Sequence, residues 1–229
     1  LLPHHTKLLI QANTTTTTSS AIIDETGNHT ITVQNNPAHS QGQTLNGNTA
    51  IYFDGADDML TISASDSHAV AAGVDYSLEF WVYHSSPLSG TGALNNQYWW
   101  NDGNDYAFKS YNHTSQDWFQ LILDSTTIMQ APFDSTSGWV HAAVARNGST
   151  HSIWLNGTLT AANTATTGDN VDIAMDNGIK KIGADGTVLD CHGYLDNIRL
   201  CVGRAAYTPN FNPYGAQKNV AVSRGGAVT

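Results

Sequence analysis

The segment "YSLEFWVYH" shows most clearly how apolar and polar positions alternate along this chain. Leu78, Phe80 and Val82 share one parity, and Glu79 begins the other. Because successive side chains of a strand point to opposite faces, this pattern predicts a strand with one face in a core. About a dozen such runs, separated by polar turns, predict an all-β fold: a two-sheet antiparallel β-sandwich of jelly-roll type. The dipeptide Asn156-Gly157 predicts a tight hairpin.

The segment "CHGYLDNIRLCVG" contains one position that does not fit an apolar face. Tyr194, Ile198 and Leu200 share a parity and are expected on one face, yet Asp196 has the same parity. A buried carboxylate is costly unless a cation or several N–H donors satisfy it. We therefore expect one of these two partners at Asp196. Arg199 has the opposite parity and is expected to pair with an acidic neighbour on the outer sheet.

The composition supports an all-β fold. Only 12% of the residues are charged, and the chain has only two glutamates. Long amphipathic helices normally carry many more Glu and Lys residues. Sandwiches of 229 residues are commonly single domains. We expect one sandwich domain over residues 1–214 and a C-terminal tail or linker over residues 215–229.

The formal net charge of −10 restricts the possible partners. An acidic surface repels phosphate backbones and attracts cations, so nucleic acid is not an expected partner. No apolar run approaches the roughly 20 residues of a membrane span, and membrane insertion is not expected. Cys191 and Cys201 would lie roughly 30 Å apart on one strand. A mutual disulfide needs Cα atoms within about 7 Å and would require this strand prediction to fail, so two free thiols are expected.

Several motifs follow one another in an order that resembles a known family. They are "AIYFDGADDMLTI", "YSLEFWVYH", "GWVHAAVARNGSTHSIWLNGTLTA", "KKIGADG" and "HGYLDNIRLCVGRAAYTPNFNPY". Together, from about Leu8 to Tyr214, they resemble a laminin-G-like jelly roll of the concanavalin A-like lectin/glucanase superfamily. The resemblance is closest to the variant found in phage and virus surface proteins and in secreted bacterial modules. It implies the jelly-roll fold and a place on a virion surface or outside the cell, but it does not define the function.

Catalysis is not expected. Laminarinase-like members of the superfamily carry Glu-x-Asp-x-x-Glu on one strand, with two carboxylates ~5–5.5 Å apart. Neither Glu25 nor Glu79 has these partners in the sequence. An atypical pair of aspartates could substitute, and a carbohydrate-active enzyme of that kind remains an alternative.

The resemblance also implies a calcium site, because related jelly rolls often hold a structural calcium between an N-terminal turn and the last strand. The matching residues are Asp24, Asn28 and Asp196. Carboxylate and amide oxygens are suitable ligands for Ca²⁺. Backbone N–H groups at Asp196 are the alternative, and the turn "DGADD" is a second candidate metal site.

The segment "NNQYWWNDGNDY", within a long loop predicted over residues 85–105, has the composition of a sugar-binding site. Exposed rings pack on a sugar's apolar face, while amides and carboxylates bond its hydroxyls. The candidate ligand-binding residues are Tyr98, Trp99, Trp100, Asn101, Asp102 and Asn104. The alternative is that these rings belong to the core.

The sequence thus predicts a non-catalytic recognition or adhesion module on a virion or cell surface, with a glycan or cell-surface carbohydrate as partner. The alternative is a structural module that decorates a virion or forms filaments and binds only neighbouring subunits.

Overall fold

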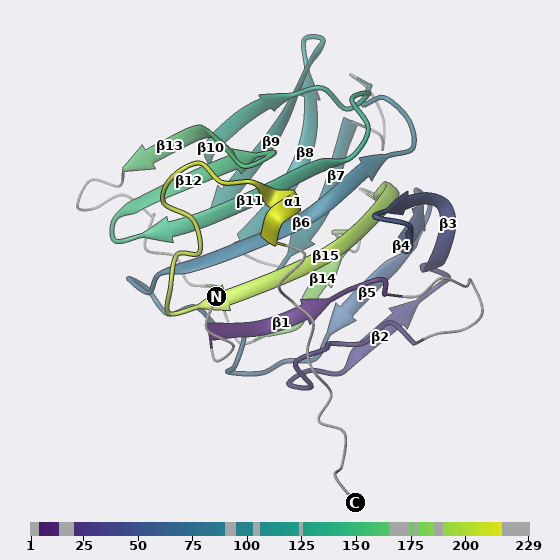
Figure 1. Cartoon of the computed structure of the whole chain (residues 1–229), viewed down its shortest axis with the longest axis horizontal. Coiled ribbons are helices and arrows are strands. Elements are labelled where there is room, and N and C mark those ends of the chain that lie inside the picture. Colours follow the sequence, from purple (N-terminus) through teal and green to yellow (C-terminus); the bar gives the residue numbers. More distant parts are fainter. Residues whose placement is uncertain are drawn as a thin grey trace, which may run out of the picture.

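The computed structural model describes residues 5–13, 21–89, 95–102, 106–123, 126–164, 175, 178–185 and 190–216. Two antiparallel sheets pack against each other, which confirms the predicted all-β sandwich (Figure 1). The tail over residues 217–229 lies outside the described part of the chain, and the domain boundary at residue 214 stays a prediction.

The first sheet has eight strands. In spatial order they are β13 (Thr158–Thr164), β12 (Thr150–Leu155), β11 (Val140–Asn147), β6 (Tyr76–His84), β15 (His192–Val202), β4 (Asn48–Asp54) and β3 (Ala38–Leu45), with β1 (Thr6–Ile10) also paired to β15. The second sheet has seven strands. They are β10 (Thr126–Phe133), β9 (Gln116–Leu123), β8 (Tyr106–His113), β7 (Asn96–Asn101), β14 (Lys180–Ile182), β5 (Met59–Ile62) and β2 (Ile31–Gln34).

The core lies between the sheets and is built from the alternating residues of both. Phe80 of β6 contacts Phe108 of β8, with 5.4 Å between ring centroids, and Phe108 contacts Phe119 of β9 at 5.6 Å. All three rings are buried. Each such ring stabilises the fold by about 1.5–3 kcal/mol relative to an exposed position.

Two Asn-Gly pairs form tight turns between strands. Asn156 (φ 50°) and Gly157 (φ 80°) join β12 to β13, which confirms the predicted hairpin. Asn46 (φ 55°) and Gly47 (φ 83°) join β3 to β4 in the same way. Positive φ at both central residues is the geometry that matches the twist of antiparallel strands.

A β-bulge divides β15 into two halves of opposite parity. Asp196 pairs with Trp81 and Arg199 with Glu79, so β15 has one residue more than β6 over this stretch, and Asn197 adopts φ 53°. Leu195 is in the core before the bulge, and Ile198 after it. The prediction that Tyr194 shares the apolar face of Ile198 is therefore wrong, because the inserted residue reverses the alternation.

The two cysteines lie near opposite ends of β15. Cys201 lies on β15 and Cys191 directly precedes it. Both thiols are free and buried, which confirms the prediction from their spacing.

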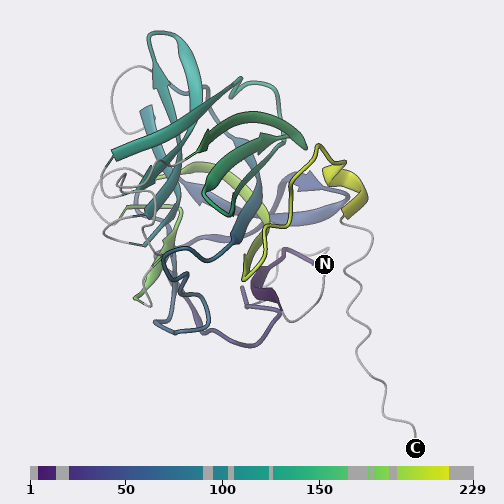
Figure 2. The same ribbon diagram turned by 90° about the vertical axis from the view of Figure 1, so that its left-hand side faces the viewer.

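The chain ends its described course on the outer face of the eight-stranded sheet. After β15, residues 203–212 lead to a short helix, α1 (Pro213–Ala216). Figure 1 looks onto this face and shows α1 in front of β11 and β6. In Figure 2 the yellow C-terminal segment runs along one side of the molecule, outside the strands.

Candidate functional site

Four aromatic side chains form a row across the outer face of the eight-stranded sheet. Tyr194 of β15 pairs with Tyr52 of β4 on one side and with Tyr83 of β6 on the other. Trp139 directly precedes β11 and lies beside Tyr83, because Val140 pairs with Val82. The strand spacing gives this aromatic row a length of about 14 Å.

The four rings contact one another in sequence along the aromatic row. The distance between ring centroids is 4.9 Å from Tyr52 to Tyr194, 6.0 Å from Tyr194 to Tyr83 and 5.8 Å from Tyr83 to Trp139. All four residues are partly exposed to solvent. Such rings can pack on the apolar faces of sugar units while their polar atoms bond hydroxyl groups.

Strand β3, which has a register shift between Ser40 and Leu45, lies against the aromatic row. The indole Nε1 of Trp139 donates a hydrogen bond to the carbonyl oxygen of Thr44 at 3.1 Å. Gly42 lies so close to the ring of Tyr194 that a Cβ atom built at Gly42 would overlap the Tyr194 hydroxyl. The positions of Tyr194 and Trp139 are therefore fixed by main-chain atoms of a neighbouring segment.

An acidic rim, composed of Asp54, Asp57, Asp58 and Asp190, adjoins the β4 end of the row. Asp54 lies two residues after Tyr52 on β4 and pairs with His192 of β15. One carboxylate oxygen each of Asp54, Asp57 and Asp58 lies within 4.8 Å of the others, so this triad could hold a metal ion.

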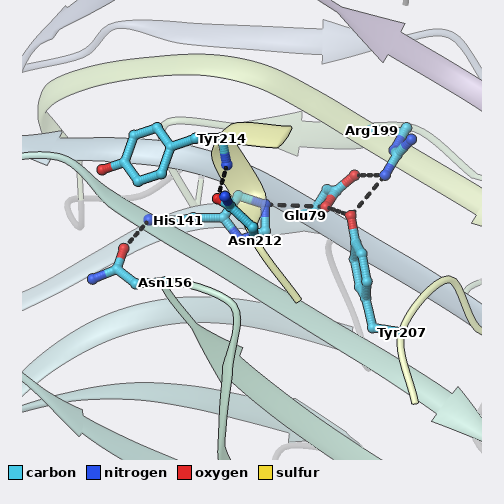
Figure 3. Close-up of polar contacts among 7 residues, drawn as sticks. All are labelled: Glu79, His141, Asn156, Arg199, Tyr207, Asn212 and Tyr214. Atoms are coloured by element: carbon cyan, nitrogen blue, oxygen red, sulfur yellow. Dashed lines mark hydrogen bonds and ion pairs between the residues drawn. The ribbon is translucent and has the colours of Figure 1, made fainter. Parts of the chain in front are cut away.

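At the opposite side of the same face, a buried ionic cluster surrounds Glu79 of β6 (Figure 3). Arg199 forms an ion pair with Oε1 of Glu79, which confirms the predicted acidic partner. Nε2 of His141 lies 3.0 Å from Oε2 of Glu79, and the Tyr207 hydroxyl donates a short hydrogen bond to the same oxygen. Arg199 in turn donates to the Tyr207 hydroxyl at 2.7 Å.

These contacts keep Glu79 ionised. Burial alone would raise the pKa of Glu79, but the charge of Arg199 and the hydrogen bonds from His141 and Tyr207 outweigh it and lower the pKa. Burial, together with the negative charge of Glu79, raises the pKa of Tyr207. The Tyr207 hydroxyl therefore stays protonated and remains a donor to Glu79.

The C-terminal segment covers this ionic cluster. The rings of Tyr207 and Phe211 stack with centroids 3.8 Å apart, and Phe211 N donates to the Gly157 carbonyl at 2.9 Å. The ring of Tyr214 lies 4.8 Å from that of Trp81, which is 1% exposed, whereas Tyr214 itself is 54% exposed. Glu79 is thus a structural anchor for the segment, whereas the aromatic row is partly exposed on the same face.

The structure replaces the predicted loop by a strand over part of its length, and the ligand-binding role of these residues stays a prediction. Residues 96–101 form β7, where Trp99 and Trp100 are both fully buried. A register shift between Tyr98 and Trp100 allows two adjacent rings to enter the core, and Trp99 Nε1 donates to Ser110 Oγ at 2.9 Å. Neither indole can present a face to a ligand, because the inserted residue cancels the expected alternation.

The other predicted residues of that loop lie apart from the aromatic row. Tyr98 and Asn101 are partly exposed on β7, in the other sheet. Asp102 is buried and accepts a hydrogen bond from Tyr106 N at 2.8 Å. Asn104 lies outside the described residues. Their role in binding stays a prediction.

Both carboxylates of the predicted calcium site already accept hydrogen bonds from the main chain. Asp196 Oδ1 accepts from Ala12 N at 2.9 Å and from Asn197 N at 2.7 Å. The oxygens of Asp24 accept from the backbone N–H groups of Leu9, Thr26, Asn28 and His29. N–H groups aimed at an oxygen repel a cation, so this donor set does not fit a calcium site, and calcium at Asp24, Asn28 and Asp196 stays an untested prediction.

Sequence reasoning missed the aromatic row because its members come from four separated parts of the chain. The sequence predicted an outward position only for Tyr83, because this residue alternates with the core residues Leu78, Phe80 and Val82. Tyr52 and Tyr194 could join it only if the pairing of β4, β15 and β6 were known. The bulge at Asn197 hid the outward position of Tyr194 as well.

Several solved structures of known proteins resemble this chain, and they do so in fold. No protein-family model matches the chain, and no curated protein matches it. Among solved structures, the binding domain of Paraclostridial Mosquitocidal Protein 1 is similar, with a TM-score of 0.64 and 13% identity over 90% of this chain and 51% of that chain. The binding domain of botulinum neurotoxin serotype D is similar with a TM-score of 0.58 and 14% identity, over 87% of this chain and 48% of that chain.

A third similar structure matches over nearly its whole length. It is domain 4 of AbnA, a GH43 extracellular arabinanase from Geobacillus stearothermophilus, in complex with arabinotriose. The TM-score is 0.56 at 14% identity, over 86% of this chain and 92% of that chain. This chain spans about half the length of the toxin domains it matches. These likenesses show that the chain shares its antiparallel β-sandwich fold with those domains.

No helix in the described part of the chain is long and apolar enough to cross a membrane.

Proposed function

We propose that this chain is a non-catalytic glycan-binding module, displayed on a virion or cell surface, and that it binds its ligand on the aromatic row. The observation that carries the proposal is the continuous contact of four partly exposed rings across four neighbouring chain segments. A chain of sugar units can lie along such a row and pack one apolar face after another on the rings.

The absence of catalysis is part of the proposal. Glu79 is the one glutamate on this face, and it is ion-paired with Arg199 and covered by the C-terminal segment. A glycosidase needs an acid that can exchange its proton with the substrate, and the low pKa of Glu79 opposes that role. The alternative is an enzyme that uses a pair of aspartates in the acidic rim. The purified protein should therefore be tested for hydrolysis of the sugars it binds.

A glycan array probed with the wild-type chain tests the function directly. We expect binding to a subset of oligosaccharides and loss of that binding in Tyr194→Ala, which removes the central ring of the row. Trp118→Ala is the matched control, because Trp118 is a partly exposed aromatic residue on β9 in the other sheet. Thermal melts of both variants verify that they fold.

Three results would overturn the proposal. If the folded wild-type chain binds no glycan on the array, the proposed glycan-binding function is wrong. If the chain instead assembles in solution and Tyr194→Ala dissociates the assembly, the row is an interface between neighbouring subunits of a structural module. Release of reducing sugar from any bound oligosaccharide would show that the chain is an enzyme.

A further inference from the structure

Uncompensated negative charge lies at one end of the aromatic row. Asp54 and Tyr52 are two residues apart on β4, so their side chains emerge on the same face of the sheet. On β15, His192 and Tyr194 are also two residues apart and emerge on the same face. His192 is beside Tyr52, with 6.4 Å between ring centroids, and pairs with Asp54 across the strands. The carboxylate of Asp54 is therefore next to the Tyr52 ring.

The acidic rim is crowded. Asp54 and Asp58 accept hydrogen bonds from main-chain N–H groups, but within the described part of the chain no basic side chain neutralises the rim. Burial is the main cause of the raised pKa of Asp190, and the neighbouring carboxylates Asp185, Asp57, Asp54 and Asp58 raise it further. Among the described residues no ion pair involves Asp54, Asp57, Asp58 or Asp190. The whole chain carries a formal charge of −10, so the rim belongs to a molecule with net negative charge.

This charge selects among the sugars that could lie on the rings. The rim attracts a cation and repels a carboxylate or sulfate group at the same place. Partly exposed tyrosine faces add to this selection, since a cation is attracted to the centre of an aromatic ring. A neutral sugar gains the ring contacts alone.

We propose that the ligand of the aromatic row is an oligosaccharide of amino sugars whose amines are free and protonated, bound with one amine at the rim carboxylates of Asp54 and Asp57. This inference rests on the proposed glycan-binding function and specifies its substrate class. The sugar rings pack along Tyr52, Tyr194 and Tyr83, and an ammonium group at the end of the chain pairs with the acidic rim. Acidic glycans are excluded from the site.

Calorimetric titration with a matched pair of ligands tests this class. The probes are a glucosamine tetramer with free amines and the corresponding N-acetylglucosamine tetramer, in mildly acidic buffer where a free sugar amine is protonated, with EDTA present so that metal ions do not neutralise the rim. We expect the free-amine tetramer to bind about tenfold more tightly. Added salt should reduce the preference, because it screens partly exposed charges.

The double variant Asp54→Asn with Asp57→Asn should bind both tetramers with equal affinity. An asparagine at position 54 keeps the oxygen that accepts the Ala56 N–H, so the turn is retained. Glu25→Gln is the matched control, because it removes one exposed negative charge elsewhere. Glu25 N bonds to Leu9, and Leu9 pairs with Arg199, on the far side of the β15 bulge from His192. This control should keep the full preference for free amines.

The outcomes separate the ligand class from the function. If both tetramers bind the wild-type chain equally, or the acetylated one binds more tightly, the amino-sugar inference is wrong and glycan binding stands. If neither tetramer binds but other oligosaccharides do, the amino-sugar inference is wrong and the proposed glycan-binding function stands. If oligolysine binds and no oligosaccharide does, both the inference and the proposed function are overturned.

Discussion

Tyr194 and Tyr83 lie directly opposite each other on β15 and β6, with ring centroids 6.0 Å apart and ring planes at 80°. The edge-to-face contact joins the two central members of the aromatic row. Tyr194 is on the outer face because the bulge at Asn197 separates its parity from that of Ile198. A single inserted residue in one strand therefore completes the candidate binding surface.

Substitution of Gly42 should disturb this surface without unfolding the protein. A side chain at position 42 meets the Tyr194 hydroxyl, so Gly42→Val is expected to displace the ring of Tyr194. We expect a loss of ligand affinity of about tenfold, the size of one ring contact, and a change in unfolding free energy below about 1 kcal/mol. Calorimetry with the glycan found on the array, together with urea unfolding, measures both. Unchanged affinity would show that the ring of Tyr194 does not bind the ligand.

The fold was readable from the sequence because its signals are local. Alternation in β6 and the Asn156-Gly157 turn each depend on a few neighbouring residues, and the structure confirms both. The expected acidic partner of Arg199 was also found. The site was not readable, because bulges at Asn197 and between Tyr98 and Trp100 change parity for reasons set by the partner strands. The composition of the segment predicted exposed rings at Trp99 and Trp100, but the bulge places both rings in the core.

Trp99 and Trp139 should behave in opposite ways when each is replaced by alanine. Trp99 is fully buried and bonded to Ser110, so Trp99→Ala should lower the unfolding free energy by about 3–5 kcal/mol. Trp139 is partly exposed at the end of the aromatic row, so Trp139→Ala should weaken ligand binding with a smaller loss of stability. Urea unfolding and calorimetry on both variants check this contrast. A strong loss of affinity in a folded Trp99 variant would restore the predicted loop as the ligand site.

The Glu79 cluster should matter for stability more than for binding. Glu79→Gln leaves the buried guanidinium of Arg199 without its counter-charge, and breaking a buried ion pair of this kind costs about 3–5 kcal/mol. Tyr207→Phe removes only a hydroxyl and should cost about 1–3 kcal/mol. Denaturant unfolding of the two variants should give this order. Equal stability of Glu79→Gln and the wild-type chain would show that the cluster does not anchor the C-terminal segment.

Asp196 should make the protein more stable in mild acid. Burial raises the pKa of Asp196 to about 6, although the N–H groups of Ala12 and Asn197 oppose the shift. Because the folded-state pKa is above that of the unfolded chain, folding favours the protonated carboxyl. The resulting stabilisation is complete below the unfolded-state pKa of about 4 and is lost as the pH rises through about 6.

The variant Asp196→Asn isolates this contribution. Other groups also titrate in this range, so the quantity to measure is the difference in unfolding free energy between the wild-type chain and the variant. We expect the difference to shift against the wild-type chain by up to about 3 kcal/mol between about pH 4 and about pH 7. Chemical unfolding at a series of pH values, in EDTA and then in excess Ca²⁺, provides the test. A pH-independent difference in EDTA would contradict the raised pKa, and a calcium-dependent gain seen only in the wild-type chain would favour the cation that the hydrogen bonds at Asp196 argue against.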